Sequence, residues 1–80
     1  MEATKHHETF GDWLRHERNR RMKSQEQLAQ KAKITAKALL NIEKGYVQPN
    51  QIRMTTRTGL AEALRMSRND LADIIERYTE

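Results

Sequence analysis

The sequence predicts a compact all-α domain of five short helices. Helix breakers are rare, since one proline and three glycines stand among 80 residues, and runs of β-branched residues are few. Apolar residues instead recur at the 3.6-residue spacing of amphipathic helices. A chain of this length buries only about 60 to 65% of its unfolded surface on folding. The chain has no cysteine, so no disulfide adds to the stability of this small core.

The first two helices are marked by polar caps followed by apolar residues. Thr9 is expected to cap a helix that runs to about residue 21, with Asp12 three residues on in the manner of a capping box. Ser24, with Gln27 three residues later, is expected to cap a second and brief helix. The apolar positions of these two helices are Phe10, Trp13, Leu14, Leu28, Ala29 and Ala32.

Thr35 is expected to cap a third helix from Ala36 to Lys44, and Gly45 is placed to end it in a left-handed conformation. Its inward positions are Ala38, Leu39 and Ile42.

The start of the fourth helix is the least defined boundary. Pro49 marks a loop, and residues 51–59 contain three threonines and a glycine, which are mediocre or poor helix formers. Helical spacing returns from Leu60 to Met66. A last helix, capped by Ser67 or Asn69, carries the apolar residues Leu71, Ile74, Ile75 and Tyr78.

Charge is distributed unevenly along the chain. Residues 14–57 hold eleven bases and three acids, a net charge of +8, while residues 1–13 and 58–80 each sum to −2. A basic centre between acidic ends favours a surface that faces a polyanion, although a solvated helical surface explains it equally well. No stretch approaches the roughly 20 apolar residues of a membrane span, and no apolar signal block is present, so we expect a soluble, cytoplasmic protein.

We expect residues 1–8 to form a flexible tail and residues 9–80 to form the domain. His6 and His7 belong to that tail, and adjacent histidines are poorly placed to bind one metal ion. There is no cysteine nucleophile and no glycine-rich phosphate loop. The sequence therefore predicts no enzyme, no metal site and no cofactor.

The most specific pattern runs from Ser24-Gln25-Glu26-Gln27-Leu28-Ala29 to Ile42-Glu43-Lys44-Gly45. It resembles the Cro/repressor (Xre-type) helix-turn-helix family, in which Ser/Thr-Gln-x-x-Leu-Ala is followed by a turn and an apolar-Glu-x-Gly ending. The resemblance covers roughly residues 14–71. It implies a five-helix lambda-repressor-like domain that inserts its third helix into the major groove of double-stranded DNA, as a sequence-specific regulator of transcription, expected to be a repressor.

The outward face of the third helix is expected to read bases. Asparagine can make a bidentate contact to adenine, lysine can donate to guanine, and small apolar groups can touch thymine methyls. For the apolar Leu40, partial burial against a neighbouring helix is the alternative. The base-reading residues are predicted to be Ala36, Lys37, Leu40 and Asn41, with Lys44 at the end of the same face.

Phosphate contacts are expected at the helix ends and in the following loop. Gln25 lies in the first turn of the second helix, where free N–H groups and the helix dipole favour an anion, although it could also be a plain exposed side chain. The family further implies a structural ion pair between Arg18 and Glu43. The predicted phosphate contacts are Ser24, Gln25, Lys33, Thr35, Lys44, Tyr46 and Asn50.

The sequence departs from the family pattern in three places. Lys33 replaces the usual turn glycine, so a residue with a Cβ has to take a positive φ or the turn differs. Met22 and Lys23 precede Ser24 where a glycine and an apolar residue are common, which leaves Met22 to reach the core by another route. The segment from Pro49 to Leu60 is two or three residues longer than usual.

Members of this family usually bind as homodimers on near-palindromic sites. The last helix is the best dimer candidate through Leu71, Ile74, Ile75 and Tyr78, with packing on the core as the equal alternative. A second class of function is a protein-interaction module on the same fold: an antirepressor, an adaptor or an antitoxin with a protein partner. RNA binding ranks last, because the chain has few aromatic residues for stacking.

Overall fold

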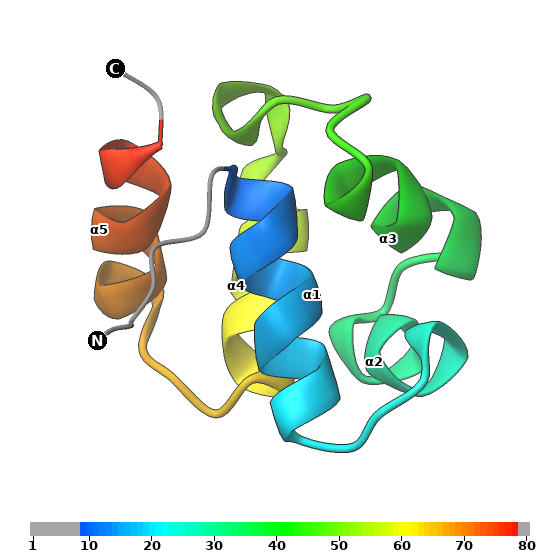
Figure 1. Ribbon diagram of the computed structural model, residues 1–80. Coiled ribbons are helices and arrows are strands. Elements are labelled where there is room, and N and C mark those ends of the chain that lie inside the picture. Colours follow the sequence, from blue (N-terminus) through cyan, green and yellow to red (C-terminus); the bar gives the residue numbers. More distant parts are fainter. Residues whose placement is uncertain (1–8, 79–80) are drawn as a thin grey trace, which may run out of the picture.

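The computed structural model describes residues 9–78 (Figure 1). The expected tail of residues 1–8, with His6 and His7, lies outside the described residues. Over the described range the chain is all helical, which confirms the predicted fold class. The elements are α1 (Phe10–Arg20), α2 (Gln25–Ala32), α3 (Ala36–Glu43), the short 3₁₀ helix η1 (Pro49–Gln51), α4 (Met54–Ala63) and α5 (Arg68–Arg77).

The predicted caps are confirmed, because each cap oxygen accepts a hydrogen bond from the backbone N–H three residues later. These distances are 3.0 Å for Thr9, 3.1 Å for Ser24, 3.0 Å for Thr35 and 3.0 Å for Ser67. Ser67, rather than Asn69, therefore begins the last helix. Helix α4 has no side-chain cap, which explains why its start was not visible in the sequence.

Helix α4 lies behind α1 in Figure 1 and packs closely on α2. Gly59 makes this approach possible. A Cβ built on Gly59 would stand 2.1 Å from the carbonyl oxygen of Ala32, so no larger residue fits without moving a helix. The glycine in the poorly defined segment therefore lies inside α4, at its contact with α2.

A second glycine sets the position of α3. A Cβ built on Gly11 would stand 2.4 Å from the carbonyl oxygen of Glu43 and 2.6 Å from that of Ile42. The start of α1 therefore rests directly on the last turn of α3. An isolated glycine inside an amphipathic helix is the signal that could have indicated this contact.

Three non-glycine residues that follow helices adopt a left-handed backbone. They are Met22 at φ 57°, Lys33 at φ 63° and Arg65 at φ 59°. The expectation for Lys33 is thereby confirmed, and Gly45 ends α3 at φ 83° as predicted. The expectation that Met22 reaches the core is wrong, because this turn directs its side chain into solvent and leaves it 89% exposed.

Helices α3 and α5 lie at opposite sides of the molecule, with α1 and α4 between them (Figure 1). Among residues 9–78, the core is built from thirteen buried apolar residues, contributed by all five helices together with Ile52 and Leu64. Within the described range, no helix is long and apolar enough to cross a membrane.

Candidate nucleic-acid interface

Helix α3 packs on α1 and α2 through one side and presents the other side to solvent. Leu39, Ile42 and Glu43 are buried. Because successive helical residues are about 100° apart, Lys37, Asn41 and Lys44 lie roughly opposite this buried side. Lys37 and Lys44 are exposed and Asn41 is half-buried, so these three side chains form the outward polar face of α3.

The apolar residues of α3 are arranged differently from the prediction. Ala36, expected on the reading face, is half-buried and packs against the core. Ala38, expected inward, is half-buried and lies outside the core. The buried side of α3 is the side that carries Leu39, Ile42 and Glu43. Ala36 lies nearer to this side than Ala38 does, because successive helical residues are about 100° apart. Ala36 therefore lies at the border between the buried side and the outward face of α3, and its predicted base contact stays a prediction.

Leu40 lies on the border of this face. It is half-buried but does not belong to the residues that pack against the core. The alternative prediction, that Leu40 is buried against a neighbouring helix, is therefore confirmed only in part, because Leu40 is partly covered but does not join the core. The apolar side chain of Leu40 lies about one helical turn from Lys37 and from Lys44, which are three and four residues away.

A buried polar network joins α3 to the two helices that carry it. The Arg18 guanidinium donates to both oxygens of the Glu43 carboxylate, at 2.7 Å from Nε and 3.1 Å from Nη2. The Gln25 amide donates to the same carboxylate at 3.1 Å. Since the Glu43 side chain is only 3% exposed, this network fixes the end of α3 against α1 and the start of α2.

Gln25 therefore has a structural role that the sequence did not predict. Its Nε2 uses one hydrogen on Glu43, which leaves the second hydrogen of that amide for another acceptor. The side chain is half-buried rather than fully exposed. Its predicted phosphate contact stays a prediction, now with a side chain whose orientation Glu43 holds.

The other predicted phosphate contacts lie at three places. Ser24 and Lys33 stand at the two ends of α2, and Thr35 caps α3; all three are exposed. Lys44 and Tyr46 follow α3, and Tyr46 is 72% exposed.

Asn50 does not continue the line of Lys44 and Tyr46. It lines a shallow pocket with Arg57 and with α5 residues that include Asp73 and Glu76. Asn50 therefore lies nearer to α5 than Lys44 and Tyr46 do, and its predicted phosphate contact stays a prediction.

The arginines of α1 and the lysines of the central segment differ in whether an acid neutralises them. Arg15, Arg18, Arg20 and Arg21 on or after α1 form ion pairs with Asp12, Glu17 or Glu43. The lysines form no ion pair with any acid among residues 9–78. These lysines are Lys23, Lys31, Lys33, Lys37 and Lys44.

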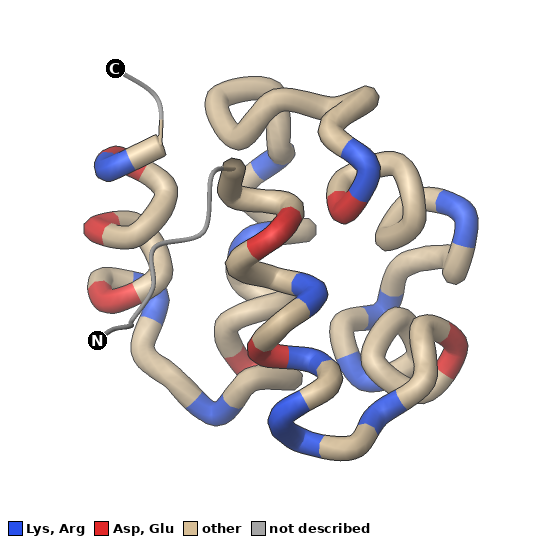
Figure 2. The backbone as a smooth tube through the Cα atoms, viewed as in Figure 1, with Lys and Arg blue, Asp and Glu red and all other residues tan. Residues whose placement is uncertain are grey.

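Figure 2 shows basic segments along α2 and α3 and in the loop before α2, while α5 carries both acidic and basic segments. The five unpaired lysines therefore lie on or next to α2 and α3. Among residues 9–78, the arginines on or next to α4 and α5 also form no ion pair: Arg53, Arg57, Arg65, Arg68 and Arg77.

Glu17 is the acid that neutralises two of the α1 arginines. Burial raises the pKa of Glu17, but hydrogen bonds from Arg20 and Arg21 outweigh burial and hold the pKa below its usual range. Arg21 also donates to the carbonyl oxygen of Leu64 at 2.9 Å. Arg21 thus joins the end of α1 to the end of α4, a contact that the sequence did not indicate.

The dimer candidate is corrected in part by burial. Leu71 and Ile75 are 1% and 3% exposed and belong to the core, so they are not available to a second chain. Ile74 and Tyr78 are half-buried and also pack against the core. These apolar side chains are covered by two neighbours. Helix α5 packs on α4, and Tyr78, directly after α5, packs against the ring of Phe10 with the ring centroids 6.2 Å apart.

No cluster of three metal-ligating side chains occurs in the part of the chain that the structure describes.

Comparison with known proteins gives one result. A family model described as helix-turn-helix matches residues 14–55, a range that runs from within α1 to the start of α4. This model represents the Cro/repressor (Xre-type) family, and with the five-helix arrangement it supports the predicted lambda-repressor-like fold. Searches of curated proteins and of solved structures gave no match.

Proposed function

This chain belongs to the Cro/repressor (Xre-type) helix-turn-helix family of DNA-binding regulators, and from that membership we propose that it is a sequence-specific repressor of transcription. In this proposal α3 enters the major groove of double-stranded DNA. Lys37 and Asn41 contact base edges, and Leu40 touches a thymine methyl. Lys44, Lys33 and the N-terminal turn of α2 contact phosphates.

The observation that carries the proposal is the contrast between the two sides of α3. The inner side is fixed by the Arg18–Glu43–Gln25 network and by the close contact at Gly11. The outer side carries Lys37, which forms no ion pair within residues 9–78. A rigid helix that presents uncompensated donors is suited to base readout, because little freedom is lost when it binds.

We propose that the chain binds DNA as a homodimer. A two-fold dimer would place two α3 helices on half-sites about one helical turn apart, roughly 34–36 Å. Of the four apolar residues predicted for the dimer surface, Ile74 and Tyr78 are half-buried while Leu71 and Ile75 are buried, so an apolar contact between chains at α5 would rest on Ile74 and Tyr78.

The decisive experiment is selection of binding sites from a random pool of duplex DNA with the full chain. Enrichment of a palindrome with half-sites one turn apart supports both parts of the proposal. Enrichment of one unrepeated half-site supports base reading and rejects the dimer. If no sequence is enriched at low ionic strength, the chain is not a sequence-specific DNA-binding protein.

A protein-interaction module is the second candidate, because apolar side chains remain exposed around α3. Leu40 lies outside the core and Tyr46 is 72% exposed. A salt titration separates the two candidates. Phosphate contacts predict that log K for DNA falls by about 0.9 for each neutralised phosphate per tenfold rise in salt, whereas an apolar protein contact responds weakly.

A further inference from the structure

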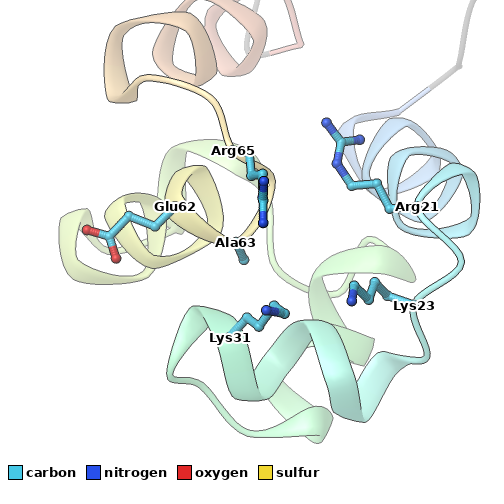
Figure 3. Close-up of a pocket in the computed structure, with 6 residues that line it drawn as sticks. All are labelled: Arg21, Lys23, Lys31, Glu62, Ala63 and Arg65. Atoms are coloured by element: carbon cyan, nitrogen blue, oxygen red, sulfur yellow. The ribbon is translucent and has the colours of Figure 1, made fainter.

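A second basic site lies outside α3, where the end of α1, the side of α2 and the end of α4 meet. These segments enclose an open groove of about 420 Å³ lined by Arg21, Lys23, Lys31, Glu62, Ala63 and Arg65. No residue of α3 lines it. Figure 3 shows the side chains of Lys23, Lys31 and Arg65 directed toward one space, while Glu62 extends away from them.

The charges in this groove are not balanced by the protein. Arg21 pairs with Glu17, but Lys23, Lys31 and Arg65 form no ion pair with any described acid, Glu62 included. Three like charges around one concave space repel each other and reduce stability. An anion between them removes that repulsion, and a group with several oxygens can accept from all three side chains.

The backbone that carries these bases is held in place. Lys23 donates its N–H to Arg18 at 3.2 Å, and its carbonyl oxygen accepts from the Arg18 side chain at 3.0 Å. Arg65 is held by a 3.1 Å bond from its N–H to Glu62. The bond from Arg21 to Leu64 fixes the α1 wall against the α4 wall. The groove is therefore formed before any ligand binds.

Arg65 has a backbone conformation for which glycine is the usual residue. At φ 59° a Cβ is disfavoured, and the side chain is exposed, so core packing does not explain an arginine there. Figure 3 shows this side chain directed toward the groove.

We propose that this groove binds clustered phosphate groups. Two sources share that chemistry: the backbone of DNA that flanks the segment under α3, and a free oligophosphate such as a small effector. The site goes beyond the proposed function, because it shares no residue with α3 and can be tested without DNA.

The test compares two full-length variants of equal net charge. Lys31→Gln with Arg65→Gln removes two groove bases. Arg68→Gln with Arg77→Gln removes two exposed bases of α5, on another side of the molecule, as the control. In sodium chloride the groove variant should melt no lower than the control, because its substitutions remove repulsion and break no ion pair.

The first measurement is thermal unfolding with sodium pyrophosphate against sodium chloride at equal ionic strength. Pyrophosphate should raise Tm of the unmodified chain by about 4–8 °C at roughly five times its Kd. The control variant should keep this rise and the groove variant should lose it.

The second measurement is the salt dependence of binding to a 30-base-pair duplex. If flanking DNA supplies the phosphates, the slope of log K against log salt should be smaller in the groove variant than in the control, by about 1.8 for two contacts. Equal slopes, with the pyrophosphate rise lost only in the groove variant, assign the site to a free oligophosphate.

The proposal is overturned if the two variants agree in both measurements. If the unmodified chain binds no duplex at all, the proposed function fails, and the pyrophosphate measurement alone still decides whether the groove is a phosphate site.

Discussion

Arg18 and Glu43 stand 25 residues apart in the sequence and form a bidentate ion pair. Nε of Arg18 lies 2.7 Å from Oε2 of Glu43, and Nη2 of Arg18 lies 3.1 Å from Oε1. Their side chains are only 12% and 3% exposed. A pair with this geometry fixes the end of α3 against α1. A buried pair gives little net stability against apolar replacements, but removing one partner leaves the other charge without compensation.

We therefore expect Glu43→Gln to lower the free energy of unfolding by about 3 kcal/mol, because Arg18 loses its counter-charge in a largely buried place. Urea unfolding followed by circular dichroism measures this loss. Glu26→Gln, at an exposed residue of α2, is the matched control and should change stability by less than about 0.5 kcal/mol. Equal midpoints for the two variants would show that the pair does not hold α3.

Substitution of the outward face of α3 should change sequence preference without changing stability. Lys37→Ala and Asn41→Ala each remove a donor that makes no side-chain hydrogen bond among the described residues. We expect a loss of about 1 to 3 kcal/mol on the selected target and a much smaller loss on unrelated duplexes, measured by fluorescence anisotropy. An equal loss on every duplex would mean that these residues contact phosphates rather than bases.

The two close-contact glycines should not tolerate alanine. Alanine normally favours a helix interior by about 1 kcal/mol over glycine, but at Gly59 its Cβ would lie 2.1 Å from the Ala32 carbonyl oxygen. We expect Gly59→Ala to destabilise the chain by at least about 2 kcal/mol. Gly45→Ala is the comparison, since nothing lies within 4 Å there and only the positive φ is unfavourable, at about 1 kcal/mol. A stabilised Gly59→Ala would contradict the contact between α2 and α4.

Met22→Gly should stabilise the chain. Met22 is 89% exposed and has a φ of 57°, so the substitution loses no packing and removes an unfavourable backbone conformation. The expected gain is roughly 0.5 to 1 kcal/mol after the larger unfolded-state entropy of glycine is subtracted. Thermal unfolding should show a higher Tm, and a lower one would indicate that Met22 makes a contact in the folded state.

Acid should weaken the link between α1 and α4 through Glu17. The pKa of Glu17 is lowered in the folded chain, so the unfolded chain takes up its proton at a higher pH than the folded chain does. The stability that Glu17 contributes is thus present above its ordinary pKa and lost as the pH falls toward the lowered value. Glu17→Gln should flatten the acid side of the stability profile, and an unaltered profile would remove Glu17 from the acid response.

Local rules predicted most of the helix-turn-helix. Thr9, Ser24, Thr35 and Ser67 begin their helices because a side-chain oxygen accepts a nearby N–H, and this chemistry depends only on residues three positions apart. The same locality made Gly45 and Lys33 recognisable as helix ends. The start of helix α4 could not be predicted from the sequence, because it lacks such a cap. Its glycine, Gly59, is explained only by close packing on α2, which is far from it in the sequence.

The sequence by itself determined the helical class, the caps, the two-helix motif and the basic centre, because periodicity, capping and charge are readable along the chain. Only the tertiary structure decided which side of α3 is outward, that Leu71 and Ile75 are core rather than dimer surface, and that Asn50 stands beside α5. It also brought Lys23, Lys31 and Arg65 to one groove. These outcomes depend on how helices pack against each other, and packing joins residues far apart in the sequence, for which no local pattern exists.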